Sequence, residues 1–161
     1  MRQLRQWSNL PFKSLNMQLL PIHQKLEDNT EFLHLPEDVT YLGMSVSFFE
    51  KIGYNPPWIG YFAERDRQLV GNAAFKGQPV GGKVEIAYGT FEAFQRQGIG
   101  TEICRELVLL VQQTDPTVRI TARTLPEPNY STRILEKNNF RLLGTVDDPE
   151  DGEVWEWEWA G

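Results

Sequence analysis

A short stretch in the middle of the chain combines two glycines, an arginine and the start of a helical apolar repeat. It reads Gln95-Arg96-Gln97-Gly98-Ile99-Gly100. The first amides of a helix have no acceptor within the helix and lie at the positive end of its dipole, and glycine lets an anion approach the backbone. We therefore expect a phosphate group to bind here, with the Arg96 guanidinium as a further contact. The alternative is an ordinary glycine turn before a helix, with Arg96 as a solvated surface residue.

The spacing excludes two common phosphate-binding motifs. No Lys-Ser or Lys-Thr pair follows Gly100, so the stretch is not a P-loop. The G-x-G-x-x-G spacing of dinucleotide-binding proteins is also absent. The phosphate must therefore belong to another kind of ligand.

The flanking segments predict a strand before the glycines and a helix after them. Residues 84–91 are rich in β-branched and aromatic side chains, and Gly89 among them indicates a bulge or a close approach of backbones. Apolar residues then recur at helical spacing, at Ile99, Ile103, Leu107, Leu110 and Val111.

Three blocks of the sequence resemble the GNAT superfamily of N-acetyltransferases. Gln95, Gly98 and Gly100 match the acyl-CoA loop of that family, which is Arg or Gln, two variable residues, Gly, a variable residue, then Gly or Ala. Upstream, Glu85-Ile86-Ala87-Tyr88 resembles the E-I-G-Y strand of the branch that includes ribosomal-protein N-terminal acetyltransferases. Downstream, residues 133–140 (R-I-L-E-K-N-N-F) resemble the R-V-L-E-K-x-G-F helix end of the same branch.

The resemblance implies both a fold and an activity. The fold is α/β of the α+β type: a mixed, largely antiparallel sheet flanked by helices, with a splayed central strand pair. The activity is transfer of an acetyl group from acetyl-CoA to a primary amine by direct nucleophilic attack, without an acyl-enzyme. The acceptor is a small-molecule amine or a protein N-terminus. The alternative is a CoA-binding sensor or interaction module of the same fold with little or no catalysis.

The resemblance also implies which residues bind the co-substrate. The loop residues hold the pyrophosphate, and the end of the strand before it holds the pantetheine arm through backbone groups. A backbone N–H near Thr90 or Phe91 is a candidate for stabilising the thioester oxyanion. The implied set is Tyr88, Gly89, Thr90, Phe91, Gln95, Arg96, Gln97, Gly98, Ile99, Gly100, Thr101 and Asn129.

Glu85 and Tyr130 are the candidate catalytic residues. An amine attacks a thioester as the free base, so a carboxylate such as Glu85 can take its proton; the alternative is a glutamate that is only solvated or only orients the substrate. Many family members place the acid for the leaving thiolate, a Tyr, where this chain has Leu135. Tyr130 is the candidate substitute and Tyr88 another. The family's helix-start Asn aligns with Pro128, so Asn129 is either a cofactor contact or only a helix cap.

Composition narrows the class of protein. The chain has 161 residues, a net charge of −6 and 40% hydrophobic residues, which indicates one globular domain and argues against a nucleic-acid partner. The lone Cys104 excludes an internal disulfide and fits a reducing compartment. No apolar run reaches the ~20 residues that span a bilayer, so we predict a cytoplasmic protein without a membrane partner. His23 and His34 lack further ligands at suitable spacing, so no metal is expected.

The predicted domain divides into three parts. Residues 1–16 form a candidate arm that packs on the domain or on a second subunit of a homodimer, residues 17–57 face the acceptor, and residues 58–161 form the cofactor-binding core. Helices are predicted over 22–28, from Pro36 to a stop at Gly53 with Val39, Leu42, Val46 and Phe49 on its apolar face, and from Asn129 to Asn138. The further strands are predicted at 17–20, 58–64, 68–76, 118–124, 141–146 and 153–159.

Overall fold

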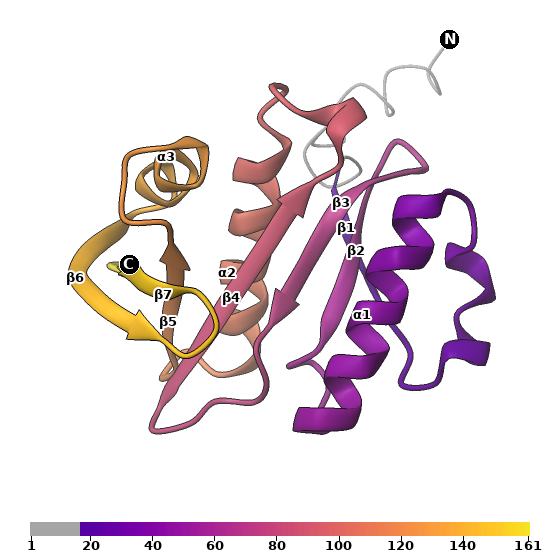
Figure 1. The fold of residues 1–161 in the computed structure, drawn as a ribbon, viewed down its shortest axis with the longest axis horizontal. Helices are drawn as coiled ribbons and strands as arrows, with labels where there is room; N and C mark the ends of the chain where they lie inside the picture. The colour runs from indigo at the N-terminus through magenta and orange to yellow at the C-terminus, as the bar shows by residue number, and fades with distance from the viewer. Residues whose placement is uncertain (1–16) are drawn as a thin grey trace, which may run out of the picture.

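Seven strands form one curled sheet in the computed structural model, which describes residues 17–161 (Figure 1). The candidate arm at 1–16 lies outside the described residues. The strand order is β1-β2-β3-β4-β5-β7-β6, and only β4 and β5 run parallel. This confirms the predicted mixed, largely antiparallel sheet. The strands are β1 (Gln18–Pro21), β2 (Gly60–Arg65), β3 (Gln68–Phe75), β4 (Lys83–Thr90), β5 (Arg119–Thr124), β6 (Phe140–Asp148) and β7 (Gly152–Trp159).

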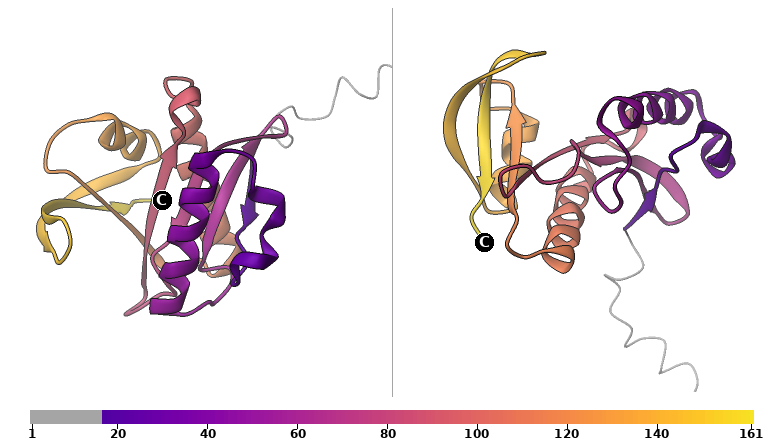
Figure 2. Two further views of the ribbon diagram at one scale, coloured as in Figure 1. Left: turned by 45° about the vertical axis from the view of Figure 1, so that its right-hand side comes forward. Right: turned by 90° about the horizontal axis from the view of Figure 1, so that it is seen from below.

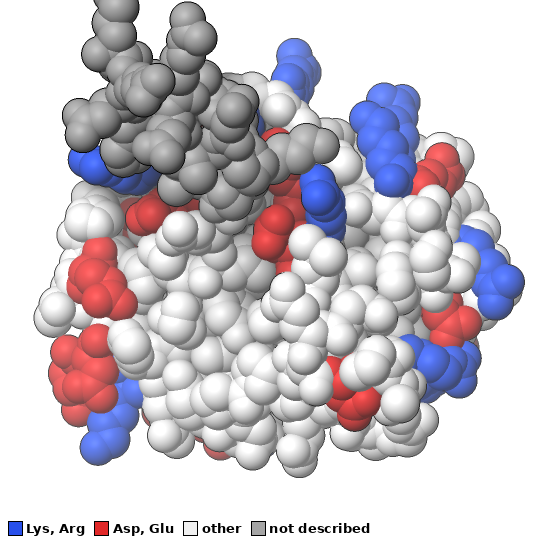
Figure 3. Space-filling model, turned by 180° about the vertical axis from the view of Figure 1, so that it is seen from behind, with Lys and Arg blue, Asp and Glu red and all other residues white. Residues whose placement is uncertain are grey.

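Helices cover both faces of this sheet. Helix α1 (Pro36–Ile52) lies on one face, and α2 (Ile99–Thr114) lies on the opposite face, where it packs on β3, β4 and α3 (Tyr130–Lys137) (Figure 2). On the side that carries α2, the surface is uncharged over much of its middle, and most charged side chains lie toward its margin (Figure 3). Within residues 17–161, no helix combines the length and the apolarity needed to cross a membrane.

The structure corrects the helix predicted over 22–28. Two short 3-10 turns stand near that place, η3 (Leu26–Asp28) and η4 (Thr30–Phe32). The buried Asn29 side chain explains the difference, because it takes over backbone hydrogen bonds that a helix would need. Its Nδ2 donates to the carbonyls of His23 and Lys25, and its Oδ1 accepts from the His23 N–H.

The buried face of α1 also differs from the prediction. Val39 is 47% exposed, whereas the neighbouring Asp38 is fully buried. The Asp38 carboxylate accepts a hydrogen bond from the Leu35 N–H and so caps the helix start, which turns residue 38 inward. Among the described side chains of this helix, the buried ones are Asp38, Leu42, Ser45 and Phe49, at helical spacing, and Val46 lies at their margin.

Strands β4 and β5 separate part of the way along their length. Their pairing runs from Lys83–Arg119 to Ile86–Ala122 and stops there, although β4 continues to Thr90. Beyond that point β5 stays paired on its other side, with β7. The central pair is therefore splayed, as the family resemblance implies.

Candidate active site

The end of β4 presents unpaired backbone groups to the gap between the splayed strands. Along an antiparallel pair, alternate residues exchange hydrogen bonds with the partner strand, and the residues between them point the other way. The Lys76 N–H donates to the Glu85 carbonyl, and the Phe91 N–H donates to the Val70 carbonyl, so the odd-numbered residues of β4 bond to β3. The backbone N–H and C=O groups of Tyr88 and Thr90 consequently face the gap.

This pattern narrows the candidates for an oxyanion donor. The Phe91 N–H lies 2.9 Å from the Val70 carbonyl oxygen and is already used in the sheet. The Thr90 N–H points to the gap, where no residue from 17 to 161 accepts it, and the Thr90 carbonyl accepts a hydrogen bond from Gln95 Nε2 at 3.4 Å. Gln95 therefore links the loop to the end of β4.

The loop after β4 leads into a helix start without a side-chain cap. After the 3-10 turn η5 (Glu92–Phe94), residues 95–98 are exposed. Gly98 is the N-cap of α2 with a left-handed φ of 75°, and no atom lies within 4 Å of the position where a Cβ would stand. The first backbone bond of the helix runs from the Glu102 N–H to the Gly98 carbonyl, so the N–H groups of Ile99, Gly100 and Thr101 have no acceptor in the helix. Arg96, also exposed, has a φ of 65°.

Gly100 serves the packing of α3 against α2. A Cβ at Gly100 would lie 2.6 Å from Ile134 Cδ1, 3.1 Å from the Tyr130 hydroxyl and 3.3 Å from Thr90 Oγ1. The absent side chain therefore lets α3 approach the first turn of α2. It also shows that the Tyr130 hydroxyl stands beside that turn and near the end of β4.

Two groups on the α2 side of β4 stay protonated at neutral pH. The Tyr88 hydroxyl lies against the Cys104 thiol, and burial raises the pKa of both groups, that of Cys104 to about 12. Cys104 is therefore a buried neutral thiol and no nucleophile. The Thr90 hydroxyl oxygen is also buried, and no residue of the described chain hydrogen-bonds to it.

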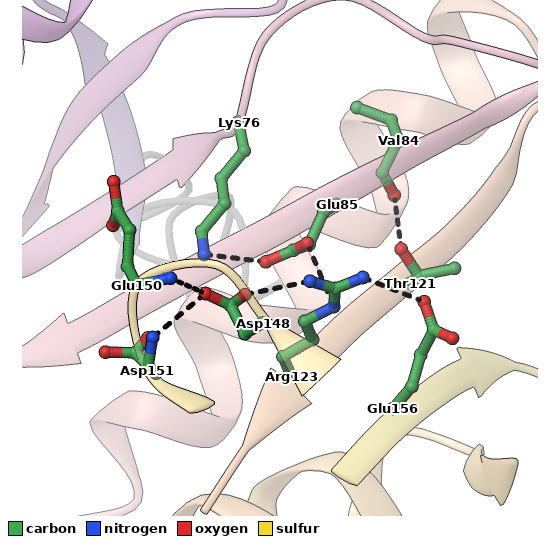
Figure 4. Close-up of polar contacts among 9 residues, drawn as sticks. All are labelled: Lys76, Val84, Glu85, Thr121, Arg123, Asp148, Glu150, Asp151 and Glu156. Atoms are coloured by element: carbon green, nitrogen blue, oxygen red, sulfur yellow. Dashed lines mark hydrogen bonds and ion pairs between the residues drawn. The ribbon is translucent and has the colours of Figure 1, made fainter. Parts of the chain in front are cut away.

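Glu85 lies in a cluster of charged side chains at the base of the gap (Figure 4). Its carboxylate is 2.7 Å from Lys76 Nζ and 3.6 Å from Arg123 Nε. The Arg123 guanidinium also reaches Asp148 at 2.8 Å and Glu156 at 3.8 Å. Two cations thus face three carboxylates from β4, β6 and β7, and Glu85 is paired rather than simply solvated.

A small cavity of about 100 Å³ lies between these groups and the unpaired end of β4. It is lined by Lys76, Glu85, Ile86, Ala87, Tyr88, Ala122, Arg123, Thr124 and Ser131. A larger cavity of about 630 Å³ lies elsewhere, between β1, η4, the start of α1, the β2–β3 hairpin and Phe94, and shares no lining residue with the small one. The small cavity adjoins the predicted cofactor and base residues, whereas most residues that line the large cavity belong to the predicted acceptor-side region 17–57.

The structure brings some predicted site residues together and leaves others apart. Glu85 and Tyr88 line the small cavity, whereas Asn129 is engaged as a helix cap, with its side chain accepting from the Thr132 N–H at 3.0 Å. Leu135, which replaces the family's Tyr, is fully buried. Sequence reasoning missed Lys76 and Arg123. No local pattern in the sequence marks either residue, because both meet Glu85 only through the pairing of strands in the folded sheet.

A mixed sheet whose central parallel pair separates beside a glycine-capped helix start is the arrangement expected of an acyl-CoA-dependent acetyltransferase. The family model of the acetyltransferase (GNAT) domain matches residues 17–141. The chain belongs to the GNAT acetyltransferase family, which confirms the family predicted from the three sequence blocks.

Solved structures with the same fold include enzymes with different acceptors. RimL, a ribosomal L7/L12 alpha-N-protein acetyltransferase in complex with coenzyme A, has a TM-score of 0.64 and 16% identity, over 89% of this chain and 93% of that one. The microcin C7 self-immunity acetyltransferase MccE, in complex with acetyl-CoA and AMP, has a TM-score of 0.63 and 15% identity, over 89% and 91%. The aminoglycoside acetyltransferase AAC(6')-Ib with coenzyme A has a TM-score of 0.60 and 23% identity, over 90% and 94%. A comparison with curated protein sequences gave no match.

Proposed function

We propose that this protein transfers the acetyl group of acetyl-CoA to a primary amine by direct attack of the amine. The observation that carries the proposal is the gap beyond Ile86, toward which Tyr88 presents its backbone N–H and C=O and Thr90 presents its N–H. The gap opens beside the uncapped start of α2. The amides of the pantetheine arm can therefore bind at the end of β4 while the diphosphate binds at the helix start. The structures of RimL with coenzyme A and of MccE with acetyl-CoA support this choice of co-substrate.

The residues of the chain fit that co-substrate. Gly98 leaves open space at the helix start, where the N–H groups of residues 99–101 have no acceptor within the helix and can donate to the diphosphate. Arg96 supplies a positive charge for the same group. The backbone N–H and C=O of Tyr88 hold the pantetheine amides. Of the two oxyanion donors predicted, we retain the Thr90 N–H, because that of Phe91 is bonded within the sheet.

Glu85 is the proposed base for the attacking amine. It lines the small cavity, but an incoming ammonium group must compete with Lys76 and Arg123 for its carboxylate. The position of the Tyr130 hydroxyl beside Gly100 favours a contact with the diphosphate or pantetheine over protonation of the sulfur. Acetyl-CoA supplies a thiolate leaving group that departs without an acid.

The acceptor is proposed only as an amine. Among the structural relatives, RimL is named for a ribosomal protein and AAC(6')-Ib for aminoglycosides, so this fold serves peptide and small-molecule amines. The division into an arm, an acceptor-side region and a cofactor core stays a prediction, as do the cytoplasmic location and a homodimer.

Two observations favour a second candidate, a CoA-binding module with little catalysis. Leu135 stands in place of the family's Tyr, and Glu85 is already paired with two cations. Binding of CoA without turnover of any amine would support this candidate.

Thermal unfolding with acetyl-CoA, followed by thiol release on an amine panel, tests the proposal. A ligand at ~100 times its dissociation constant adds ~2.7 kcal/mol, or about 5–10 °C for a chain of this size. Gly98→Glu puts a negative charge at the proposed diphosphate site and should abolish the shift.

Gly82→Glu is the matched control, because Gly82 also has a positive φ, of 74°, and open space around the Cβ position, but lies at the other end of β4. An unchanged acetyl-CoA shift in Gly98→Glu would refute the diphosphate assignment. The absence of any shift in the parent protein would refute the proposed function.

A further inference from the structure

Lys76 is a primary amine inside the candidate active site. It follows β3 directly, opposite Glu85, and its backbone N–H donates to the Glu85 carbonyl at 2.9 Å. Its side chain turns to the same face as that of Glu85, and Nζ lies 2.7 Å from Glu85 Oε2 (Figure 4). Among the described residues that line the small cavity, it is the one lysine.

Lys76 Nζ lies where the nitrogen of an acceptor amine is expected to lie, next to the proposed base. The nitrogen contacts the carboxylate proposed as base, and it shares a cavity with Ala87 and Tyr88, beyond the point where β4 leaves β5. The Lys76 side chain is 42% exposed, so it is free to change rotamer within the cavity. Arg123, in contrast, is held by carboxylates on two further strands.

We propose that Lys76 is itself an acetyl acceptor, so that the enzyme acetylates this lysine when no external amine is present. The proposal rests on the proposed function. The unprotonated Nζ forms the C–N bond with the acetyl carbonyl carbon, and the C–S bond breaks. Glu85 takes the proton that the nitrogen loses, and the CoA thiolate is protonated from solvent. The products are N-acetyl-lysine and free CoA, and no other reactant is needed.

Self-acetylation changes the charge of the site. Acetyl-lysine has no charge, so the ion pair with Glu85 is lost and Arg123 becomes the remaining cation beside that carboxylate. The alternative is a cross-strand salt bridge with no chemical role, in which Lys76 reacts no faster than a surface lysine.

The test is incubation of the full-length protein with acetyl-CoA at mildly alkaline pH without an amine, followed by intact mass and peptide mapping. Lys83 is the internal reference, because it is exposed and lies at the start of β4, outside the residues that line the cavity. We expect Lys76 to be acetylated at least about tenfold faster than Lys83, since a positioned base contributes about 100-fold or more.

Three variants decide between the two explanations. Glu85→Gln and Gly98→Glu should each slow acetylation of Lys76 toward the rate of Lys83 without changing Lys83 itself, and Lys76→Arg should remove the single fast site. Thermal unfolding confirms that each variant is folded. Equal rates at Lys76 and Lys83 in the parent protein, or fast acetylation of Lys76 that persists in both Glu85→Gln and Gly98→Glu, would overturn the proposal.

The amine panel, run on the same preparation, separates this proposal from the proposed function. Turnover of an external amine with no preference for Lys76 refutes self-acetylation and leaves the acetyltransferase assignment standing. Absence of both reactions, with or without CoA binding, overturns both.

Discussion

Gly71 on β3 gives a test of the geometry that holds the candidate site together. A Cβ at this position would lie 2.3 Å from the Gly89 carbonyl oxygen, 2.9 Å from Ile103 Cδ1 and 3.2 Å from Thr90 Cα. Two of these three atoms belong to the backbone of β4, so a rotamer change cannot relieve the contact. Gly71→Ala must therefore push β4 away from β3 or displace α2.

Gly71→Ala should lower the unfolding free energy by about 3 kcal/mol or more, at the upper end of the range for overpacked cores. This corresponds to a fall in Tm of about 6–12 °C for a chain of this size. Because the displaced atoms are those of Gly89 and Thr90, the stabilisation by acetyl-CoA should also shrink. Urea unfolding gives the free energy, and thermal unfolding with and without acetyl-CoA gives the effect on binding.

Gly43→Ala is the matched control for this variant. Gly43 lies within α1 and has no atom within 4 Å of the Cβ position. The same added methyl group should raise the stability by about 0.8–1 kcal/mol, because alanine favours a helix interior over glycine. An unfolding free energy of Gly71→Ala within about 0.5 kcal/mol of the parent would refute the close approach of β3 and β4.

Two further predictions concern the cap of α3 and the acid limb of the stability curve. Asn129→Ala should lower the unfolding free energy by about 1 kcal/mol in urea unfolding, because it removes the hydrogen bond to the Thr132 N–H; an unchanged value would argue against the cap. The Asp148 carboxylate accepts the Glu150 N–H, pairs with Arg123 and accepts the Asp151 N–H, which lowers its pKa to about 2. A depressed carboxyl pKa stabilises the folded chain fully above the ordinary pKa, so this contribution should disappear as the pH falls from about 4 through about 2, and Asp148→Asn should flatten the measured pH dependence in that window.

Features that depend on neighbours in the sequence could be predicted. The glycine-bearing start of α2, its apolar face and the Asn129 cap all depend on residues within a few positions of each other. The three family blocks added the sheet and its splayed pair. The predictions of the helix at 22–28 and of the buried face of α1 were wrong where a buried polar side chain hydrogen-bonds to the backbone, as Asn29 does after β1 and Asp38 does at the start of α1.

By itself, therefore, the sequence determined the family, and it predicted a phosphate-binding loop at residues 95–100 and Glu85 as the candidate base. Only the tertiary structure decided that Glu85 is paired with Lys76 and Arg123, because these residues lie on different strands and meet through register. The choice of Thr90 over Phe91 as the proposed oxyanion donor also depends on the fold, since the β3–β4 ladder uses the N–H of Phe91 and turns that of Thr90 toward the gap. Local preference specifies turns, caps and helix faces, whereas the charges around a site depend on which strands the fold places side by side.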